Sequence, residues 1–276
     1  MAALLALASS LMWGTADFLG GLTSRRLPVL AVYGLSQAVG FVALMAAAIV
    51  TGGWSSPPGY WPWAIAASIV GFGAMIAFYE ALSLGPMGIV SPLVSLSVLV
   101  PVAVALVRGE VPTSLQVLGI ICAIVGILLA SGPELTSAES ARPLVLAGVA
   151  TVGFGAMFVL MAEGSRHDPL MTMLGMRVTT LAIFAVVLVV VRSFGGARPK
   201  DAIPLAAIGI FDAGANVLFG FATTLGLLAT TAVLGDLYPV VTAILAAIVL
   251  RERLRAVQYA GVAAAIIGVV LISSGA

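Results

Sequence analysis

Apolar residues along this chain form long runs that are separated by short polar intervals. Each run extends over about twenty residues, mostly Ala, Val, Leu, Ile, Gly and Phe, and an α-helix needs ~20 such residues to cross the hydrocarbon core of a bilayer. A transmembrane β-barrel would instead show segments of about ten residues with alternating hydrophobicity, and the sequence contains none. The pattern therefore predicts an all-α integral membrane protein.

Charges, Gly/Pro clusters and turn residues divide the chain into ten predicted transmembrane helices. Their bounds are 3–22, 29–50, 62–84, 87–107, 113–131, 143–163, 170–191, 202–226, 229–250 and 255–274. The longest polar interruption that is not shaped like a tight turn is 132–142, and it separates two sets of five helices. We therefore predict a first five-helix repeat over 1–131, a linker over 132–142 and a second repeat over 143–276.

The two sets of five helices carry matching glycine, proline and polar residues. Gly14, Arg25 and Pro28 match Gly155, Arg166 and Pro169 at an offset of 141, and Glu110, Gln116, Gly119 and Gly126 match Glu252, Gln258, Gly261 and Gly268 at an offset of 142. Because five is an odd number of membrane crossings, the second copy must be inverted relative to the first. Inverted repeats are typical of secondary transporters, which bind their substrate near the midplane between the repeats.

Composition narrows the classes of partner and cofactor. Charged residues are 8% of the chain and hydrophobic residues 62%, against about 25% charged residues in soluble domains. The net charge of +1 argues against nucleic-acid binding, and the single cysteine, Cys122, excludes an internal disulfide and a cysteine-cluster metal site. The first residues lack the basic segment of a signal peptide, so they are interpreted as a retained first span. We expect membrane lipid as the surroundings and no cofactor. The oligomeric state is left open, with a monomer as a plausible form.

The loop charges predict an orientation in the membrane. Nine Lys and Arg residues fall in loops on one side and two on the other, with Arg177 inside a span. The positive-inside rule places the side with nine in the cytoplasm. Both termini are then expected outside, in a prokaryotic plasma membrane.

Short motifs with aromatic and charged residues stand at fixed places in several spans. They are Trp13-Gly14, Ala77-Phe78-Tyr79-Glu80-Ala81-Leu82, Leu237-Tyr238-Pro239-Val240 and Leu250-Arg251-Glu252-Arg253-Leu254, followed by Gln258, Gly261 and Gly268. Through these motifs the chain resembles the EamA family of the drug/metabolite transporter superfamily over essentially its whole length. The resemblance implies ten helices in two inverted halves, a cavity lined mainly by spans 1, 3, 4, 6, 8 and 9, and a peripheral pair of spans 5 and 10. It also implies export or exchange of amino acids, other small metabolites or drugs.

The chain departs from the family pattern at several positions. A basic residue is common in spans two and seven of the family, but here Arg177 in span seven faces Ser36 in span two. Asp236 stands where a small residue is usual. The only lysine is the loop residue Lys200, which argues against an anionic phosphate substrate.

Ionisable residues within the spans are the first candidates for a site, because each costs roughly 2.5–3.5 kcal/mol or more in the hydrocarbon layer. They are Asp17, Glu80, Arg177, Asp212 and Asp236. Asn216 follows Asp212 by four residues, which places the amide and the carboxyl on one helical face. This pair could bind an ammonium group or carry a proton, and the alternative is a hydrogen bond that joins two helices.

Two further acids have aromatic neighbours. Asp236 precedes Tyr238-Pro239, where proline removes a backbone donor and is expected to kink the helix. An acid beside the freed carbonyls suits a cation or a proton, and the alternative is an acid favoured by the helix dipole. Asp17 follows Trp13 by four residues, which suits an amine through charge and cation–π attraction; the alternative is an acid that reaches the membrane interface.

The remaining candidates have stronger structural explanations. Glu80 lies within a turn of Gly85-Pro86, so reaching for the interface is the favoured interpretation. Arg177 is expected to pair with an intramembrane acid, with a substrate carboxylate as the alternative. Glu110 and Glu252 close equivalent spans and suggest a structural role at the turn.

These residues favour a secondary transporter of small metabolites that works by alternating access. No phosphate-binding Walker motif is present, so the driving force would be a gradient, with protons as a candidate coupling ion. Export of amino acids or similar compounds is the leading hypothesis. A carrier of organic cations, quaternary ammonium compounds or drugs is the alternative, supported by the excess of intramembrane acids and by the aromatic residues Trp13, Tyr33, Tyr79 and Tyr238. A non-transporting scaffold is less favoured. An enzyme is not expected, because the chain lacks a His/Cys/Asp metal set and a Ser/His pair.

Overall fold

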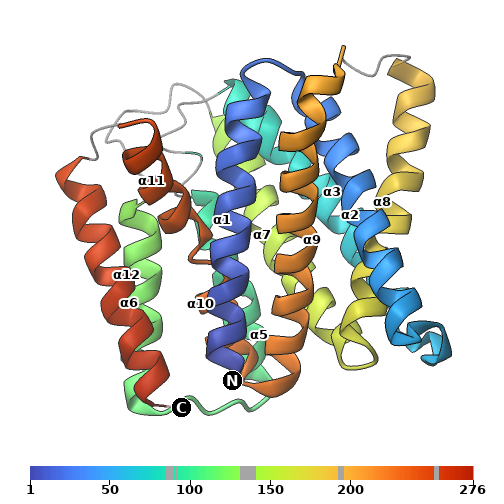
Figure 1. Ribbon diagram of the computed structural model, residues 1–276. Coiled ribbons are helices and arrows are strands. Elements are labelled where there is room, and N and C mark those ends of the chain that lie inside the picture. Colours follow the sequence, from blue (N-terminus) through green and yellow to red (C-terminus); the bar gives the residue numbers. More distant parts are fainter. Residues whose placement is uncertain (85–89, 91–92, 131–140, 192–195, 252–254, 276) are drawn as a thin grey trace.

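In the computed structural model of this protein, every secondary-structure element of the described residues is a helix (Figure 1). The described residues are 1–84, 90, 93–130, 141–191, 196–251 and 255–275. Among them, eight helices are long and apolar enough to cross a membrane, and two shorter apolar helices cover Ser95–Val107 and Ser114–Ala130. The predicted all-α architecture of ten spans is confirmed.

The first repeat contains five spans in chain order. Its elements are α1 (Ala2–Ser24), α2 (Val29–Thr51), η1 (Gly53–Ser55), η2 (Pro58–Tyr60), α3 (Trp61–Leu84), η3 (Ser95–Val98), α5 (Leu99–Val107) and α6 (Ser114–Ala130). The fourth span, predicted over 87–107, is described at residue 90 and from residue 93 onward.

The second repeat has the same number of spans. Its elements are α7 (Ala141–Ser165), α8 (Pro169–Val191), η4 (Pro199–Asp201), α9 (Ala202–Leu225), α10 (Leu228–Gly235), α11 (Tyr238–Val249) and α12 (Ala256–Ser274). Most of the predicted linker, 132–140, lies outside the described residues, and the last two linker residues belong to α7. Glu252 also lies outside them.

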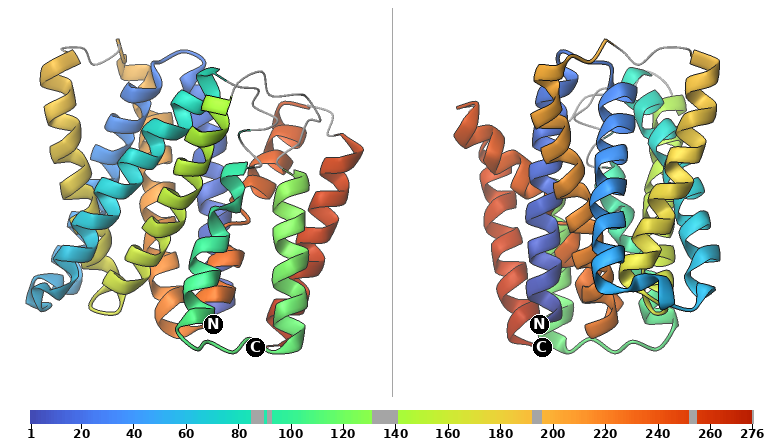
Figure 2. Two further views of the ribbon diagram at one scale, coloured as in Figure 1. Left: turned by 180° about the vertical axis from the view of Figure 1, so that it is seen from behind. Right: turned by 45° about the vertical axis from the view of Figure 1, so that its right-hand side comes forward.

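The contacts between helices occur in pairs that reflect the repeat. The most extensive contacts between helices join α1 to α9, α3 to α7, and α6 to α12. Because α7 is the copy of α1 and α9 the copy of α3, the first two are the same contact made twice. Both termini lie at one end of the molecule, and α6 and α12 stand side by side at its edge (Figures 1 and 2).

Glycines explain how closely α6 and α12 approach each other. A Cβ on Gly126 would lie 2.4 Å from the backbone nitrogen of Ala265, and a Cβ on Gly261 would lie 2.3 Å from the backbone nitrogen of Ala130. Small residues allow such backbone contact between helices in membranes, where no hydrophobic effect drives the helices together. The two glycines of each copy therefore form a symmetric interface, and spans five and ten pair as the family resemblance implied.

The matched glutamines also perform the same task in both copies. The side-chain oxygen of Gln116 accepts a hydrogen bond from the backbone of Thr113 at 2.8 Å, and that of Gln258 accepts one from Arg255 at 2.9 Å. Each bond satisfies a free backbone N–H at the start of a helix. The repeat seen in the sequence is thus a repeat of local structure.

The ninth span is divided into two half-helices. Helix α10 ends at Gly235, Asp236 and Leu237 form a turn, and α11 begins at Tyr238. Pro239 stands in the first turn of α11, where its missing N–H is tolerated, and it cannot bond to the carbonyl of Gly235 four residues earlier. The kink predicted from the proline is therefore a full break.

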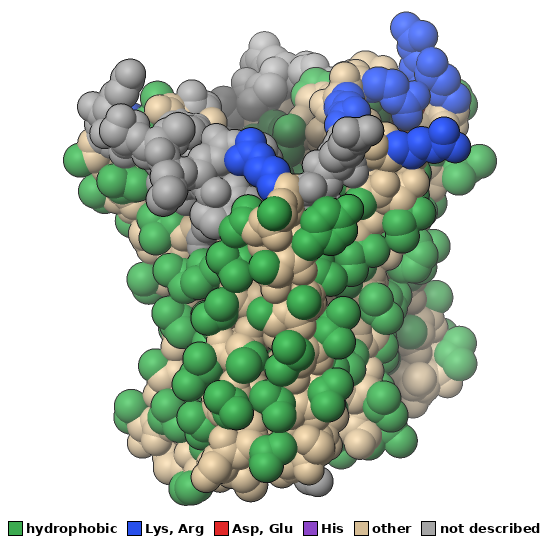
Figure 3. Space-filling view, turned by 90° about the vertical axis from the view of Figure 1, so that its left-hand side faces the viewer, with side chains coloured by type: hydrophobic (Ala, Val, Ile, Leu, Met, Phe, Trp, Pro, Cys, Tyr) green, Lys and Arg blue, Asp and Glu red, His purple; other side chains and the backbone are tan. Residues whose placement is uncertain are grey.

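The outer surface of the bundle is apolar, and most of its Lys and Arg residues gather at one end. Ile49, Val107, Val189, Ile203 and Ile248 are among the exposed aliphatic side chains, and an apolar surface of this extent is stable in lipid rather than in water. Figure 3 shows apolar side chains over the height of one face and Lys and Arg at the end opposite the termini. The arrangement is that of a multi-pass integral membrane protein.

Candidate functional site

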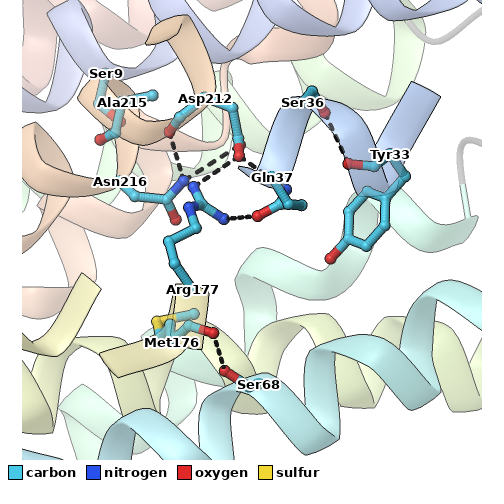
Figure 4. A network of polar contacts seen from close by, with 10 residues as sticks. All are labelled: Ser9, Tyr33, Ser36, Gln37, Ser68, Met176, Arg177, Asp212, Ala215 and Asn216. Carbon is cyan, nitrogen blue, oxygen red and sulfur yellow. Dashed lines mark hydrogen bonds and ion pairs between the residues drawn. The ribbon is translucent and has the colours of Figure 1, made fainter. Parts of the chain in front are cut away.

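A partly buried ion pair joins two charged residues of the second repeat. Arg177 on α8 donates to Asp212 on α9, with 2.7 Å between Nη2 and Oδ2. The amide of Gln37 on α2 donates to the same carboxylate oxygen at 3.2 Å and accepts a hydrogen bond from Arg177. Figure 4 shows the three side chains converging from three helices. The pair is thus charge-compensated and tied to both repeats.

Asn216 completes this network from the same helix as Asp212. Its Nδ2 donates to the backbone oxygen of Asp212 at 2.5 Å and to the carboxylate at 3.2 Å. The arginine and both amide side chains are buried, whereas 25% of the Asp212 side chain is exposed. Asp212 and Asn216 share a helical face, as predicted, and the Asn216 amide holds the Asp212 carboxylate in place.

Close packing of α2 against α9 brings the network together. A Cβ on Gly209 would lie 2.3 Å from the backbone oxygen of Ser36, the residue before Gln37. Gly209 stands one turn before Asp212, so the absence of its side chain lets Gln37 reach the carboxylate. Gly40, one turn after Ser36, is also in contact with Gly209.

Asp17 is the unpaired acid next to this network. Its charge interacts with that of Asp212, and among the described residues no hydrogen bond or ion pair reaches its carboxyl group. Asp17 is one turn beyond Trp13 on the same face of α1, yet Trp13 is buried and Asp17 is exposed. The inward face of α1 therefore becomes open between these two turns, on the side away from the termini.

Two tyrosines connect Asp17 and Asp212 to an apolar pocket. The pocket has a volume of about 310 Å³ and is lined by Val29, Leu30, Tyr33, Phe72, Met75, Ile76 and Tyr79 of α2 and α3. Tyr79 interacts electrostatically with Asp17, and Tyr33 with Arg177 and Asp212. The volume of the pocket is near the lower limit of roughly 300–1,000 Å³ for small-molecule sites. The pocket combines apolar walls with nearby charges.

Aromatic side chains fill the space on the terminal side of Asp17. Trp13 contacts Phe158, Phe219 and Tyr238, with ring centroids 5.5, 5.6 and 6.3 Å apart, and Phe158 contacts Phe219 at 5.2 Å. These four residues, called the aromatic cluster below, come from α1, α7, α9 and α11. Such contacts contribute about 0.5–1.5 kcal/mol each beyond area burial. The cluster closes the space between the repeats on this side.

Asp236 occupies a different environment from the other acids. Only 1% of its surface is exposed, and neither of its carboxylate oxygens has a hydrogen-bond partner among the described residues. It lies in the turn between α10 and α11, and its charge acts on Tyr238. Tyr238 is also influenced by Asp17, so it stands between the two acids.

Other acids near the helix ends serve structural contacts. Glu80 pairs with Arg142 at the start of α7, with 2.5 Å between the atoms, and both side chains are exposed. Both oxygens of Glu110 accept backbone N–H groups at the start of α10, from Leu228 at 2.9 Å and Ala229 at 3.1 Å. Glu110 thereby caps a half-helix of the opposite repeat, which is a longer-range role than the turn predicted from sequence.

Gln37 was not recognised from the sequence. The repeat aligns Arg177 of span seven with Ser36 of span two, and the Ser36 hydroxyl donates to the backbone oxygen of Tyr33 in its own helix. The available signal was an amide side chain in the middle of an apolar run, since such a group needs partners in a membrane. No periodicity identifies which helix supplies them.

Comparison with known proteins assigns the chain to a class. The sequence model described as "EamA-like transporter family" matches residues 1–132 and again 142–274. A solved crystal structure of another protein superposes with a TM-score of 0.83 at 18% sequence identity, over 99% of this chain and 96% of that chain. A search of curated proteins finds no significant match. The structural likeness concerns the fold alone.

Proposed function

This chain belongs to the EamA-like transporter family, and we propose that it is a secondary transporter of small metabolites that carry a protonated amine. Amino acids are the first candidates, exported by alternating access between the two repeats. The observation that carries the proposal is Asp17, an exposed carboxyl group without a partner among the described residues, beside the compensated Arg177–Asp212 pair.

The charges near the pocket favour an ammonium group over an anion. Arg177 neutralises Asp212, so the charge of an ionised Asp17 has no compensating cation among the described residues. In an environment of low dielectric constant, this charge attracts a cation much more strongly than in water. Tyr33 and Tyr79 add aromatic faces, which also attract cations.

One atom in the network supports an amino acid in particular. The Nε of Arg177 is buried and has no acceptor among the described residues. Nε packs against Gly40, so a carboxylate could reach it only after a small movement of α2. An amino acid would then place its ammonium group at Asp17 and its carboxylate towards Arg177.

The alternative substrate class is an organic cation without a carboxylate. It is favoured because both terminal nitrogens of Arg177 already have partners in Gln37 and Asp212. The apolar lining of the pocket suits the hydrocarbon part of either class.

The shape of the molecule supports a state that is open at the Lys- and Arg-rich end. Asp17 and Tyr79 are exposed near that end, whereas the aromatic cluster and the pair of Arg108 with Glu163 lie towards the termini. With the Lys- and Arg-rich end in the cytoplasm, this is the state in which an exporter of a prokaryotic plasma membrane loads its substrate.

Counterflow in proteoliposomes tests the proposal. Vesicles loaded with leucine are diluted into labelled leucine, and leucine, its decarboxylated amine and N-acetyl-leucine are compared as competitors. We expect the first two to compete and N-acetyl-leucine, which lacks the amine charge, to fail. An organic-cation carrier would prefer the decarboxylated amine to leucine.

The variant Asp17→Asn should lose at least tenfold in exchange rate. Asp201→Asn is a matched control, because Asp201 is an acid of the η4 turn, 3.7 Å from Arg26. Equal competition by N-acetyl-leucine, or unchanged exchange in Asp17→Asn, would contradict the assignment of Asp17 to substrate binding.

A further inference from the structure

The carboxyl group of Asp236 is enclosed where the ninth span is broken. Every residue of α10 is buried, and α10 contacts α1, α5, α6 and α9. Asp236 itself is 1% exposed, and both of its oxygens are without partners in the described part of the chain. A lone ionised carboxylate is very costly at such a position, because nothing replaces its lost hydration.

Among the described residues, the elements around Asp236 carry no opposite charge. Its neighbours Val233, Leu234, Leu237 and Val240 belong to one apolar cluster. The titratable groups on the elements around it are Asp17 on α1, Cys122 on α6, Asp212 on α9, Tyr238 on α11 and Tyr259 on α12; η3, α5 and α10 carry none. Of these groups only Tyr238 interacts electrostatically with Asp236.

These contacts favour a proton over a metal ion. No group of three or more His, Cys, Asp or Glu residues occurs among the described residues, so side chains alone form no metal site there. A sodium ion would have to be held mainly by backbone carbonyls of the broken helix. A proton needs only the carboxylate. The protonated group also gains a donor, and the carbonyl of Gly235 is a nearby acceptor because Pro239 cannot bond to it.

We propose that Asp236 is the proton-binding site that couples transport to the proton gradient. This inference rests on the proposed function and separates the proton from the substrate, which is assigned to Asp17. In the described state the carboxylic acid is closed off from both sides. When α10 and α11 move relative to each other, the acid meets water, releases one proton, and later accepts one from water on the other side of the membrane.

The position of the half-helices makes Asp236 sensitive to movement of either repeat. Helix α10 is held at its start by Glu110 of the first repeat. Helix α11 is held against α1 by Thr242, whose hydroxyl donates to the backbone oxygen of Gly14 at 3.1 Å. A shift between the repeats therefore changes the turn that contains Asp236.

Two measurements test the inference. Infrared difference spectroscopy of the purified protein follows the band of a protonated carboxylic acid during a pH titration. Accumulation of substrate driven by a pH gradient is compared with counterflow exchange, which needs no net proton movement. For Asp236→Asn, which resembles the protonated acid in shape, we expect loss of the carboxylic acid band, exchange close to that of wild type, and at least tenfold weaker gradient-driven accumulation.

Control variants separate the possible outcomes. Asp17→Asn should keep the infrared band of the carboxylic acid but lose counterflow exchange. Asp201→Asn should keep both the band and the exchange. If wild-type protein shows no exchange of any amine, the proposed substrate class fails, while the infrared band still decides the protonation of Asp236. Full gradient-driven accumulation by Asp236→Asn, an unchanged acid band in that variant, or a band that responds to sodium at fixed pH would overturn the inference.

Discussion

The pairing of Arg177 with Asp212 is the residue-scale feature that most changes the picture drawn from sequence. The sequence makes Asp212 a candidate for binding an ammonium group or a proton, but its charge is compensated by Arg177, 35 positions earlier in the chain. The intramembrane acids without a partner among the described residues are Asp17 and Asp236, which differ in their exposure. One position suits an amine that arrives from water, and the other a proton held away from water.

Removal of Arg177 should show how far the stability of the protein depends on neutralising the charge of Asp212. Arg177→Met leaves Asp212 without its cation. Breaking a fully buried pair costs about 3–5 kcal/mol, and solvent at the exposed quarter of the Asp212 side chain lowers that cost. The double variant Arg177→Met/Asp212→Leu should regain most of that stability, because no uncompensated charge remains. Thermal unfolding in detergent measures the stability of the single and of the double variant.

Arg142→Met is the matched control for this experiment. Its partner Glu80 is exposed at the end of α3, and exposed ion pairs contribute about 0–1 kcal/mol. An Arg177→Met protein as stable as the control variant would show that the pair contributes nothing to the fold.

Some residues of the candidate site were predictable and others were not. The spacing of Asp212 and Asn216, or of Trp13 and Asp17, fixes a shared helical face, because this follows from local geometry alone. The partner of a buried charge depends on which helices cross, and this is set by close contacts such as that of Gly209 with Ser36. Gln37 was missed for that reason.

At the scale of elements, the paired helices α6 and α12 offer a direct test of glycine packing. Gly261→Ala would place a Cβ 2.3 Å from the backbone nitrogen of Ala130, which cannot move without its helix. We expect a loss of about 1–3 kcal/mol, as in other overpacked sites. The measurement is resistance to unfolding by a denaturing detergent.

Gly148→Ala provides the opposite expectation on another helix. No atom lies within 4 Å of the Cβ position at Gly148 in α7, so alanine should stabilise that helix by about 0.5–1 kcal/mol. Similar effects of both substitutions would contradict the packing explanation.

The sequence predicted the elements well except where one span is interrupted. Length and hydrophobicity gave the spans, since a bilayer fixes how many apolar residues a helix needs. The break at Asp236 and Leu237 was predicted only as a kink, because Pro239 signals lost hydrogen bonds and not how the chain rearranges. The capping of α10 by Glu110 joins residues 118 positions apart, which no local pattern reveals.

At the scale of the whole molecule, charge distribution makes a prediction about orientation. The Lys and Arg residues gather at the end opposite the termini (Figure 3), so both termini should lie outside the cytoplasm. A reporter that is active only outside the cytoplasm should be active when fused to the C-terminus. Activity only of a cytoplasmic reporter would reverse the assignment, and the open end of the molecule would then face outward.

The aromatic cluster has a consequence for the energy economy of the cell that makes this protein. A continuous water-filled pathway through a carrier lets ions leak across the membrane. Such a leak dissipates the membrane potential and the ion gradients that pumps maintain. Trp13, Phe158, Phe219 and Tyr238 come from both repeats and lie in ring-to-ring contact. Each ring contact that must separate slows the opening of this side by up to about tenfold, at about 1.4 kcal/mol per factor of ten. A slow carrier that does not leak is the expected result.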